Sequence, residues 1–365
     1  MTFAVHTRTQ PGVTGRDATL YVLDDGAGGR AEVWPALGFN CLHWEAVRDG
    51  RTLDLLYADP ALFTDGRPTR SGIPILFPFP NRIRDGRFRW EGKDYQLPLN
   101  DGTLKNAIHG FACRRPWRVV GQGADGSSAW IVGEFQTGRD APDCLSLWPA
   151  DHLIRITYRL GTGSLRVEAE VVNPDRRTLP FGLGYHPYYR MPFAPDATAA
   201  DCLVQAPAHE MWPLVESLPT GDRRPLDPAR NLNTPRRFGD LQLDDVLTGL
   251  SSKADADGLR DCGVLRSGAA TLRLLASPAF RELVVFTPPH RQAFCIEPYT
   301  CTTDAINLQA RGVDICDATG RVLGTFIQAQ DVDAGLLTLA PGGRWTAVFE
   351  MRLDSPTSDA KKATS

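Results

Sequence analysis

Apolar residues in this chain recur at every second position rather than at helical spacing. Ile154, Ile156 and Tyr158 alternate with polar neighbours, and the alternation resumes after the Gly-Thr-Gly turn at 161–163 and continues to residue 173. A period of two places alternate side chains on opposite faces of a strand. We therefore predict that this region forms an antiparallel hairpin.

The same alternation predicts strands elsewhere in the chain. Near the C-terminus Trp345, Ala347, Phe349 and Met351 alternate with polar residues, and only Val348 interrupts the polar face. Convincing helical periodicity is hard to find. Many short strands separated by turn residues predict stacked antiparallel sheets, so the expected fold class is all-β. The other strand candidates are the segments 18–25, 31–37, 41–47, 129–135, 271–277 and 282–286.

The chain length bears on domain organisation. The 365 residues, of which 42% are hydrophobic, exceed the roughly 100–200 residues of an average domain, but large all-β folds often do so. The 28 prolines and 34 glycines are spread throughout without a linker or low-complexity block. We predict one domain over residues 1–353. Residues 354–365 contain no large apolar side chain and are expected to form a disordered tail.

Charge and termini narrow the range of partners. The 40 basic and 43 acidic residues are interspersed and give a net charge of −3, so no basic footprint for nucleic acid or an anionic membrane is present. The first residues do not resemble a signal peptide, and no run of about 18 apolar residues occurs. We expect a cytoplasmic protein that binds a small neutral ligand. No feature indicates an oligomeric state.

The cysteine spacing and the absence of cofactor motifs exclude several other classes of protein. The eight cysteines show no CxxC pair and no regular framework, so they are expected to be free thiols. The chain contains no P-loop, no GxGxxG after a strand and no HExxH motif. We therefore expect neither a nucleotide cofactor nor a metal ion.

One Pro-rich stretch stands apart from the strand pattern. Pro74, Pro78 and Pro80 fall within seven residues, which excludes a helix and a central strand and leaves a rigid irregular loop. That loop delivers Asn81 and Arg82. A loop held by prolines that presents a planar guanidinium suits a fixed polar ligand such as a sugar. The alternative is a surface crossing with an exposed arginine.

After this loop the chain continues through a short hairpin and returns to a histidine. Glu91 and Gly92 lie between two short alternating segments, as in a tight hairpin turn. His109 and Gly110 follow. The imidazole of His109 adds a second polar group to the expected ligand site.

These motifs resemble those of a known family. The run GIPILFPFPNRI at 72–83 and AIHGF at 107–111 are similar to the aldose 1-epimerase (mutarotase) family, and three later segments follow in the order that this family requires. They are FGLGYHPYY at 181–189, QLDDVL at 242–247 and AFCIEPYT at 293–300. The resemblance implies a large antiparallel β-sandwich, a free aldohexose as substrate and no cofactor.

The resemblance also implies a catalytic pair. Mutarotation needs one group to take the proton from the C1 hydroxyl and another to protonate the ring oxygen. We assign Glu297 as the base and His186, with a pKa near ~6.5, as the general acid. Glu297 is expected at the end of an apolar strand, where Pro298 stops the ladder and partial burial raises the carboxyl pKa. The alternatives are a buried structural histidine and a carboxylate in a salt bridge.

Four further residues are expected to hold the sugar. Asn81, Arg82, His109 and Asp244 match the sugar-site motifs of the family. The guanidinium of Arg82 can donate two parallel hydrogen bonds, and a carboxylate can accept bonds from sugar hydroxyls. Asp245 competes with Asp244, because adjacent side chains of a strand lie on opposite faces and only one of them can enter the site.

Three other functions fit parts of the same evidence. A hexose-6-phosphate 1-epimerase would need cations for the phosphate, and Arg84, Arg114 and Arg115 are the candidates. A non-catalytic sugar sensor on the same fold would not need an acid–base pair. A glycoside hydrolase would use paired carboxylates such as Glu297 and Asp244, but that chemistry leaves the histidine without a role.

Overall fold

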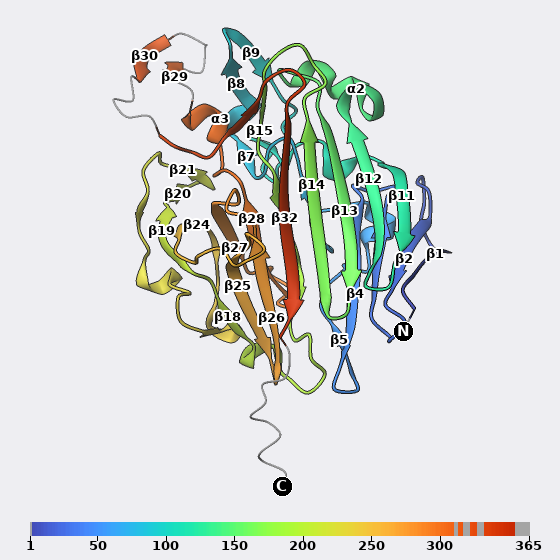
Figure 1. Cartoon of the computed structure of the whole chain (residues 1–365). Helices are drawn as coiled ribbons and strands as arrows, with labels where there is room; N and C mark the ends of the chain where they lie inside the picture. Colours follow the sequence, from blue (N-terminus) through green and yellow to red (C-terminus); the bar gives the residue numbers. More distant parts are fainter. Residues whose placement is uncertain (1, 310–312, 317–321, 327–331, 355–365) are drawn as a thin grey trace.

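The computed structural model describes residues 2–309, 313–316, 322–326 and 332–354, and it consists mainly of antiparallel sheets (Figure 1). The expected disordered tail lies outside the described residues from 355 onward. The largest sheet has nine strands, in the order β11 (Arg118–Ala124), β12 (Ala129–Gln136), β13 (Leu153–Gly161), β14 (Ser164–Val172), β32 (Arg344–Leu353), β26 (Ala270–Ala276), β25 (Arg260–Ser267), β18 (Leu203–Gln205) and β23 (Arg236–Arg237).

The predicted hairpin lies at the centre of this sheet. Strands β13 and β14 pair over their full lengths, with Gly161 opposite Ser164 beside the turn. Along β13 the residues Ile154, Ile156 and Tyr158 are fully buried, whereas the side chains between them are partly exposed. The prediction of a half-buried strand pair is confirmed.

The second large sheet carries the candidate site. Its strands run in the order β22 (Arg224–Pro225), β19 (Ala208–Trp212), β24 (Asp244–Leu250), β27 (Glu282–Phe286), β28 (Ala293–Tyr299), β16 (Gly184–Tyr185) and β6 (Ile75–Leu76), and β17 (Tyr189–Arg190) also pairs with β28. The Pro-rich loop contributes β6 at the edge of this sheet. An edge position is where proline is tolerated in sheets.

A third sheet is formed by the first five strands, and the other strands form two-stranded pairs. The five are β1 (Ala4–Thr9), β2 (Thr19–Asp24), β3 (Arg30–Trp34), β4 (Asn40–Arg48) and β5 (Arg51–Asp54). The pairs are β7 (Arg82–Ile83) with β10 (Ala107–Ile108), β8 (Arg87–Trp90) with β9 (Lys93–Gln96), β15 (Leu179–Phe181) with β31 (Leu337–Leu339), β20 (Leu214–Val215) with β21 (Leu218–Pro219), and β29 (Val313–Cys316) with β30 (Val322–Phe326).

Helical segments are short, in agreement with the weak helical periodicity. The α-helices in the described part of the chain have four residues each: α1 (Leu62–Asp65), α2 (Thr137–Asp140) and α3 (Ala305–Leu308). Short 3-10 turns join other elements: η1 (Arg84–Gly86), η2 (Ala112–Arg114), η3 (Pro142–Leu147), η4 (Ala199–Asp201), η5 (Pro228–Arg230) and η6 (Phe238–Asp240). None of the described helices is long and apolar enough to cross a membrane.

Buried aromatic rings join the sheets into a β-sandwich. Tyr185 on β16 stacks on Phe349 of β32 with ring centroids 5.5 Å apart, which connects the two large sheets. The ring of Tyr158 on β13 packs against the ring of Phe39, the residue before β4, with centroids 5.5 Å apart. Large rings bury much apolar area and prefer offset or tilted contacts of this kind. The predicted all-β sandwich is therefore confirmed.

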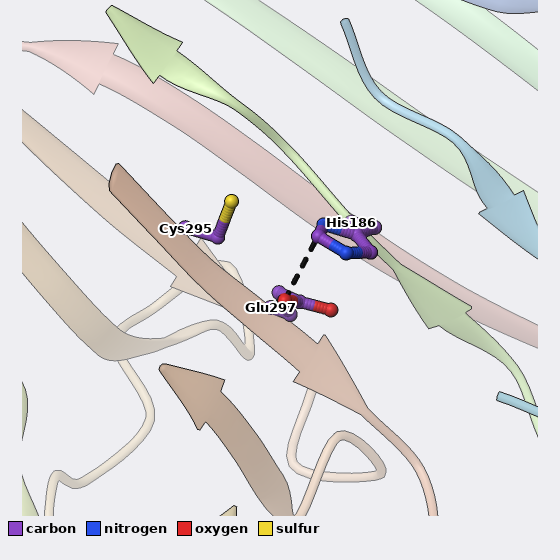
Figure 2. Close-up of side chains that lie close together, drawn as sticks. All are labelled: His186, Cys295 and Glu297. Carbon is purple, nitrogen blue, oxygen red and sulfur yellow. Dashed lines mark ion pairs between the residues drawn. The ribbon is translucent and has the colours of Figure 1, made fainter. Parts of the chain in front are cut away.

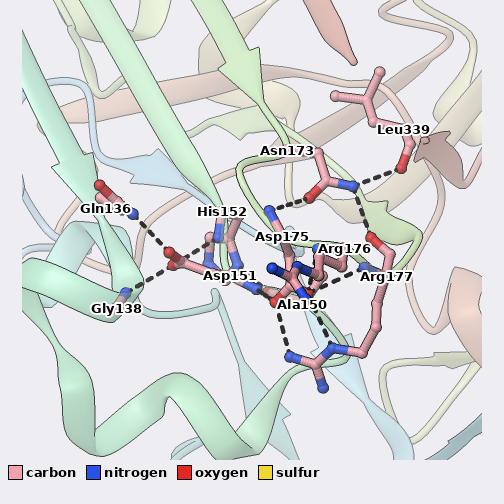
Figure 3. A network of polar contacts seen from close by, with 10 residues as sticks. All are labelled: Gln136, Gly138, Ala150, Asp151, His152, Asn173, Asp175, Arg176, Arg177 and Leu339. Carbon is pink, nitrogen blue, oxygen red and sulfur yellow. Dashed lines mark hydrogen bonds and ion pairs between the residues drawn. The ribbon is translucent and has the colours of Figure 1, made fainter. Parts of the chain in front are cut away.

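A polar network surrounds the buried ring of His152, which contacts the Pro-rich loop, and Figure 3 shows the residues of this network. The Nδ1 of His152 lies 3.0 Å from the carbonyl oxygen of Ala150, and its Nε2 lies 2.6 Å from the hydroxyl of Thr137. Since a carbonyl can only accept, Nδ1 carries the hydrogen and Nε2 accepts from the hydroxyl. Burial lowers the His152 pKa to about 4, so the ring is neutral. Phe77 of the loop packs edge-on against this ring at 5.2 Å.

The network also connects the ends of several strands. Asp151 accepts hydrogen bonds from the Gln136 side chain at 2.6 Å and the Gly138 amide at 2.7 Å. The Asn173 side chain donates to the carbonyl oxygens of Arg177 and Leu339. These polar groups are satisfied where β12, β13, β14 and β31 meet (Figure 3). His152 is thus a buried histidine of the core.

The Pro-rich loop requires glycine at Gly110, which yields a stability prediction. Gly110 has a φ of 62°, and a Cβ there would lie 2.2 Å from the carbonyl oxygen of Phe77. Gly92 has a φ of 80° but open space around a Cβ. We expect Gly92→Ala to lower the free energy of unfolding by about 1–2 kcal/mol, and Gly110→Ala by about 3 kcal/mol or more because an atomic overlap is added. Denaturant unfolding of both variants measures the difference. Equal losses would show that the contact with Phe77 is not restrictive.

Candidate active site

The catalytic pair predicted from the sequence comes together where a strand ladder is interrupted. His186 lies between β16 and β17, which both pair with β28, and its amide donates to the carbonyl oxygen of Pro74 at 3.0 Å. In register, Tyr299 of β28 pairs with Gly184, and the next paired residue on that side is Phe294. The imidazole occupies this gap. Its Nδ1 lies 3.3 Å from Oε1 of Glu297 (Figure 2).

The expectation that Glu297 ends its strand is wrong. Strand β28 continues through Pro298 to Tyr299, and Pro298 is in register with Leu283 of β27. Proline is tolerated within a sheet where ladder bonding is incomplete, and β28 lacks a paired neighbour on its other side at this point. Glu297 therefore projects from the interior of a buried strand and is only 1% exposed.

The two-stranded pair β7–β10 positions the next group of predicted residues. Arg82 is in register with Ile108, and the amide of His109 donates to the Asn81 carbonyl oxygen at 2.9 Å. Asn81 and His109 have positive φ values of 52° and 66°. Such conformations cost a non-glycine residue about 1–3 kcal/mol and are found preferentially at functional sites.

The guanidinium of Arg82 is held from two directions. Its Nη1 donates to Oδ1 of Asn81 at 3.0 Å, and its Nε lies 3.5 Å from the buried carboxylate of Asp101. Burial tends to raise the pKa of Asp101, but hydrogen bonds from Asn106, Thr103 and the Lys105 amide outweigh it and bring the pKa to about 2. Asp101 is therefore a permanent anion. Asn81 also organises the site through Arg82 and His109, a role the sequence did not suggest.

The remaining predicted residues lie around the same pair. The rings of His109 and His186 meet edge-on with centroids 5.7 Å apart. Asp244, the first residue of β24, has an exposed side chain whose charge acts on Glu297 and is itself influenced by Arg82. Although the side chain reaches solvent, the protein atoms around its carboxyl group displace part of its water and raise the Asp244 pKa, and Arg82 opposes that shift.

Asp244 and Asp245 have different surroundings. The carboxylate of Asp245 lies 3.3 Å from Nε of Arg230, whereas Asp244 is the one coupled to Arg82 and Glu297. A cavity of about 610 Å³ opens beside both carboxylates and is also lined by Arg230, Met211 and Ser217. The cavity reaches the candidate site at Asp244, and its lining does not include His186 or Glu297.

The ionisation of the pair differs from the expectation based on sequence. Burial lowers the pKa of His186 to about 3, so the assumption of a value near 6.5 is wrong. Burial raises the Glu297 pKa well above its ordinary value, and Asp244 raises it further, while the hydrogen bond from Tyr299 and the charge of Arg82 oppose the shift. The empty site therefore favours a neutral imidazole beside a protonated carboxyl group. Both shifts have one cause, the loss of water around two charges.

Two tyrosine hydroxyls contact the outer atoms of the pair, Nε2 of His186 and Oε2 of Glu297. The Tyr188 hydroxyl donates to the Thr69 carbonyl oxygen at 2.5 Å and lies 3.2 Å from Nε2 of His186. Its only hydrogen is used, so the second contact is a hydrogen bond only if Nε2–H donates to the tyrosine oxygen. Tyr299 donates to Oε2 of Glu297 at 2.5 Å. The tyrosines therefore leave Nδ1 and Oε1 as the two facing atoms of the pair, 3.3 Å apart.

The hydrogen bonds of Tyr188 and Tyr299 to the pair were not predicted from the sequence, although a signal was present. Tyr188 follows His186 by two residues, and Tyr299 follows Glu297 by two; Cys295 precedes Glu297 by two. Residues two apart on extended chain share a face. The spacing could have indicated which neighbours contact the pair.

Comparisons with known proteins agree with this fold and set of motifs. Residues 20–352 match the sequence model of the aldose 1-epimerase family. The chain therefore belongs to the aldose 1-epimerase family, whose members are isomerases acting on carbohydrates.

Individual relatives are distant. The uncharacterized protein YihR of Escherichia coli is 25% identical over 245 residues, which are 66% of this chain and 72% of YihR. The galactose mutarotase of Sus scrofa is 29% identical over 165 residues, 44% of each chain. The crystal structure of a galactose mutarotase-like protein from Clostridium acetobutylicum superposes with a TM-score of 0.77 at 21% identity, covering 97% of this chain and 99% of that one. This likeness supports the same fold.

The hydrogen bond from His186 to Tyr188 can be tested with a matched pair of variants. Tyr188→Phe removes the acceptor for Nε2–H, so we expect the neutral imidazole to divide between its two tautomers. We also expect kcat/KM for anomer exchange to fall about 2- to 12-fold, the equivalent of one neutral hydrogen bond. Imidazole nitrogen NMR and polarimetry measure the two effects.

Tyr189→Phe is the control, because the buried Tyr189 hydroxyl has no hydrogen-bond partner among the described residues. It should leave the tautomer and the rate unchanged. A single Nε2–H tautomer that persists in Tyr188→Phe would contradict the assignment.

Proposed function

We propose that this protein is an aldose 1-epimerase that interconverts the α and β anomers of a free aldohexose by acid–base ring opening and closure. The observation that carries the proposal is the buried His186–Glu297 pair, whose Nδ1 and Oε1 atoms lie 3.3 Å apart. The anomeric and ring oxygens of a sugar are bonded to the same carbon. Two adjacent oxygens can thus meet two adjacent proton-transfer atoms.

In the proposed mechanism Glu297 takes the proton from the C1 hydroxyl while His186 gives the Nδ1 proton to the ring oxygen. The C1–ring oxygen bond breaks, C1 becomes an aldehyde carbon, and the pair changes from imidazolium and carboxylate to imidazole and carboxylic acid. Rotation about the C1–C2 bond presents the other face of the aldehyde. The same transfers in reverse close the ring as the opposite anomer.

Burial assists the opening step in this scheme. Low dielectric surroundings disfavour charges, which lowers the His186 pKa and raises the Glu297 pKa. Transfer of both protons converts a charged pair into a neutral pair. The protein thereby stabilises the protonation state that accompanies the open-chain sugar.

The other predicted residues are proposed to orient the ring. Arg82 donates to sugar oxygens from the part of its guanidinium not held by Asn81 and Asp101, and His109 adds a hydrogen bond from the partner strand at the same end of the β7–β10 pair. Asp244 accepts bonds from hydroxyls on the side of the cavity. These contacts keep C1 at the catalytic pair.

The alternatives receive less support from the geometry. Arg84 lies 3.7 Å from the carboxylate of Asp304, and Arg115 is paired with Asp143, so two of the three arginines considered for a 6-phosphate are already engaged. A sugar sensor has no need for a buried pair that shares one labile proton. A hydrolase would need a pair of carboxylates flanking a glycosidic bond, which leaves the Nδ1–Oε1 contact unused.

Polarimetry of freshly dissolved α-glucose and α-galactose tests the proposal directly. We expect the purified protein to accelerate the change in optical rotation of at least one of them in proportion to its concentration. A calorimetric titration of the same preparation supplies the comparison. Binding without acceleration, for these sugars and for glucose 6-phosphate, would overturn the epimerase proposal in favour of a sensor.

Glu297→Gln is expected to lower the mutarotation rate by roughly 10²–10⁴ while sugar binding is largely retained, because an amide keeps the shape but cannot accept the proton. Glu282→Gln is the matched control. Glu282 is equally buried on the neighbouring strand, where its carboxylate accepts a hydrogen bond from the Trp212 indole. Melting curves exclude misfolding. A folded Glu297→Gln enzyme with a rate near that of Glu282→Gln would remove Glu297 from the mechanism.

The pH profile follows from the single shared proton. The active form of the pair holds one proton, so kcat/KM should fall at low pH when a second proton is added and at high pH when the last one is lost. The lowered pKa of His186 places the acid limb near pH 3, and the raised pKa of Glu297 places the basic limb well above 4.5. Rates measured across this range on protein shown to be folded check the assignment. A basic limb at the ordinary glutamate value would contradict it.

A further inference from the structure

Three potential metal ligands meet at the catalytic pair. Among the described residues, His186, Cys295 and Glu297 are the only group of three such side chains whose ligand atoms all lie within 4.8 Å of one another. Cys295 and Glu297 project from β28 two residues apart, and His186 approaches from the gap beside that strand (Figure 2). All three are at least nine-tenths buried.

An unsatisfied atom points into this group. The Nδ1 of His186 is buried and has no hydrogen-bond partner among the described residues, and Oε1 of Glu297 lies 3.3 Å from it. Its Nε2 is engaged by Tyr188, which orients the ring. A histidine whose second nitrogen is fixed by a hydrogen bond is the usual arrangement of a metal ligand.

We propose that His186 Nδ1, Cys295 Sγ and Glu297 Oε1 form a site for a soft divalent cation such as Zn²⁺, and that the bound ion reversibly inhibits the enzyme. This proposal rests on the same pair as the proposed function. Imidazole, thiolate and carboxylate are all ligands of zinc, at about 2.0–2.3 Å, and three protein ligands with one open position are typical of accessible zinc sites.

The charges and distances are compatible with such an ion. A thiolate and a carboxylate neutralise a divalent cation, so the occupied site has no net charge in its low-dielectric surroundings. The thiol loses its proton on binding. Side-chain rotations need to close the present separations by about an ångström or less to reach tetrahedral spacing. Magnesium and calcium prefer oxygen ligands and should bind poorly.

Inhibition follows from the atoms involved. The ion would occupy Nδ1 and Oε1, the two atoms assigned to proton transfer. Sugar and metal should therefore compete, and each should weaken the apparent affinity of the other. Because Cys295 takes no part in the proposed proton transfers, it distinguishes the metal site from the sugar site.

Cobalt provides an optical test of the ligand set. Chelator-treated protein is titrated with Co²⁺, and we expect one equivalent to produce thiolate-to-cobalt charge-transfer absorption that Zn²⁺ abolishes. Cys295→Ala should lose this absorption and bind Zn²⁺ at least about 100-fold more weakly, since even outer-shell partners contribute about 10- to 100-fold to affinity. Cys301→Ala is the control, because Cys301 is a buried free thiol four residues beyond Glu297 and outside the cluster.

Two further variants and a measurement of inhibition complete the test. If Cys295→Ala does not fold, Cys295→Ser and His186→Asn supply the same comparison by metal titration. Absence of the thiolate band in the wild type, or its persistence in Cys295→Ala, would overturn the proposal. Zinc inhibition of anomer exchange that is weakened in Cys295→Ala, relative to its own zinc-free rate, supports it. Metal binding in a protein without mutarotase activity would reject only the proposed function, and activity without metal binding would reject only this site.

Discussion

The exclusion of water from His186 and Glu297 is the constraint on which the candidate site depends. Two ionisable groups in contact within a sheet would each prefer to be neutral, and the pKa shifts of both side chains express that preference. The fold maintains it by placing both on buried backbone and by satisfying their outer atoms with tyrosine hydroxyls. As a result the neutral form of the pair is favoured, and this is the form that the proposed mechanism reaches when the sugar ring opens.

The sheet architecture makes this arrangement possible. A continuous ladder beside β28 would leave no room for an imidazole, whereas the break between β16 and β17 admits one without separating the strands on either side. The β7–β10 pair then brings the guanidinium of Arg82 and the imidazole of His109 to the same place. Phe77 of the Pro-rich loop packs on the buried His152 ring and pairs with Gly110 next to His109, which connects the β7–β10 pair to the core.

The fold could be predicted from the sequence because the alternation of apolar and polar residues depends only on neighbouring positions of one strand. The alternation through Ile154, Ile156 and Tyr158 depends only on which face of a strand meets the core. The candidate site residues were identified from family motifs that follow one another in the expected order. The structure brings these residues together, and their roles stay predictions. What the sequence missed depends on distant contacts. Pro298 was taken to end its strand because the interrupted neighbouring ladder is formed by residues more than one hundred positions earlier, and the His186 pKa depends on burial by strands that no local pattern reveals.

The left-handed backbone at Asn81 and His109 has a consequence for how this protein can change. Both residues hold conformations that glycine would adopt at little cost, so replacing either one would relieve strain while deleting a polar group of the site. Directed evolution for heat resistance alone would therefore be drawn toward these two positions and would remove polar groups from the candidate site as it succeeded. A laboratory lineage that is also selected for turnover should gain its heat resistance at other positions and retain Asn81 and His109.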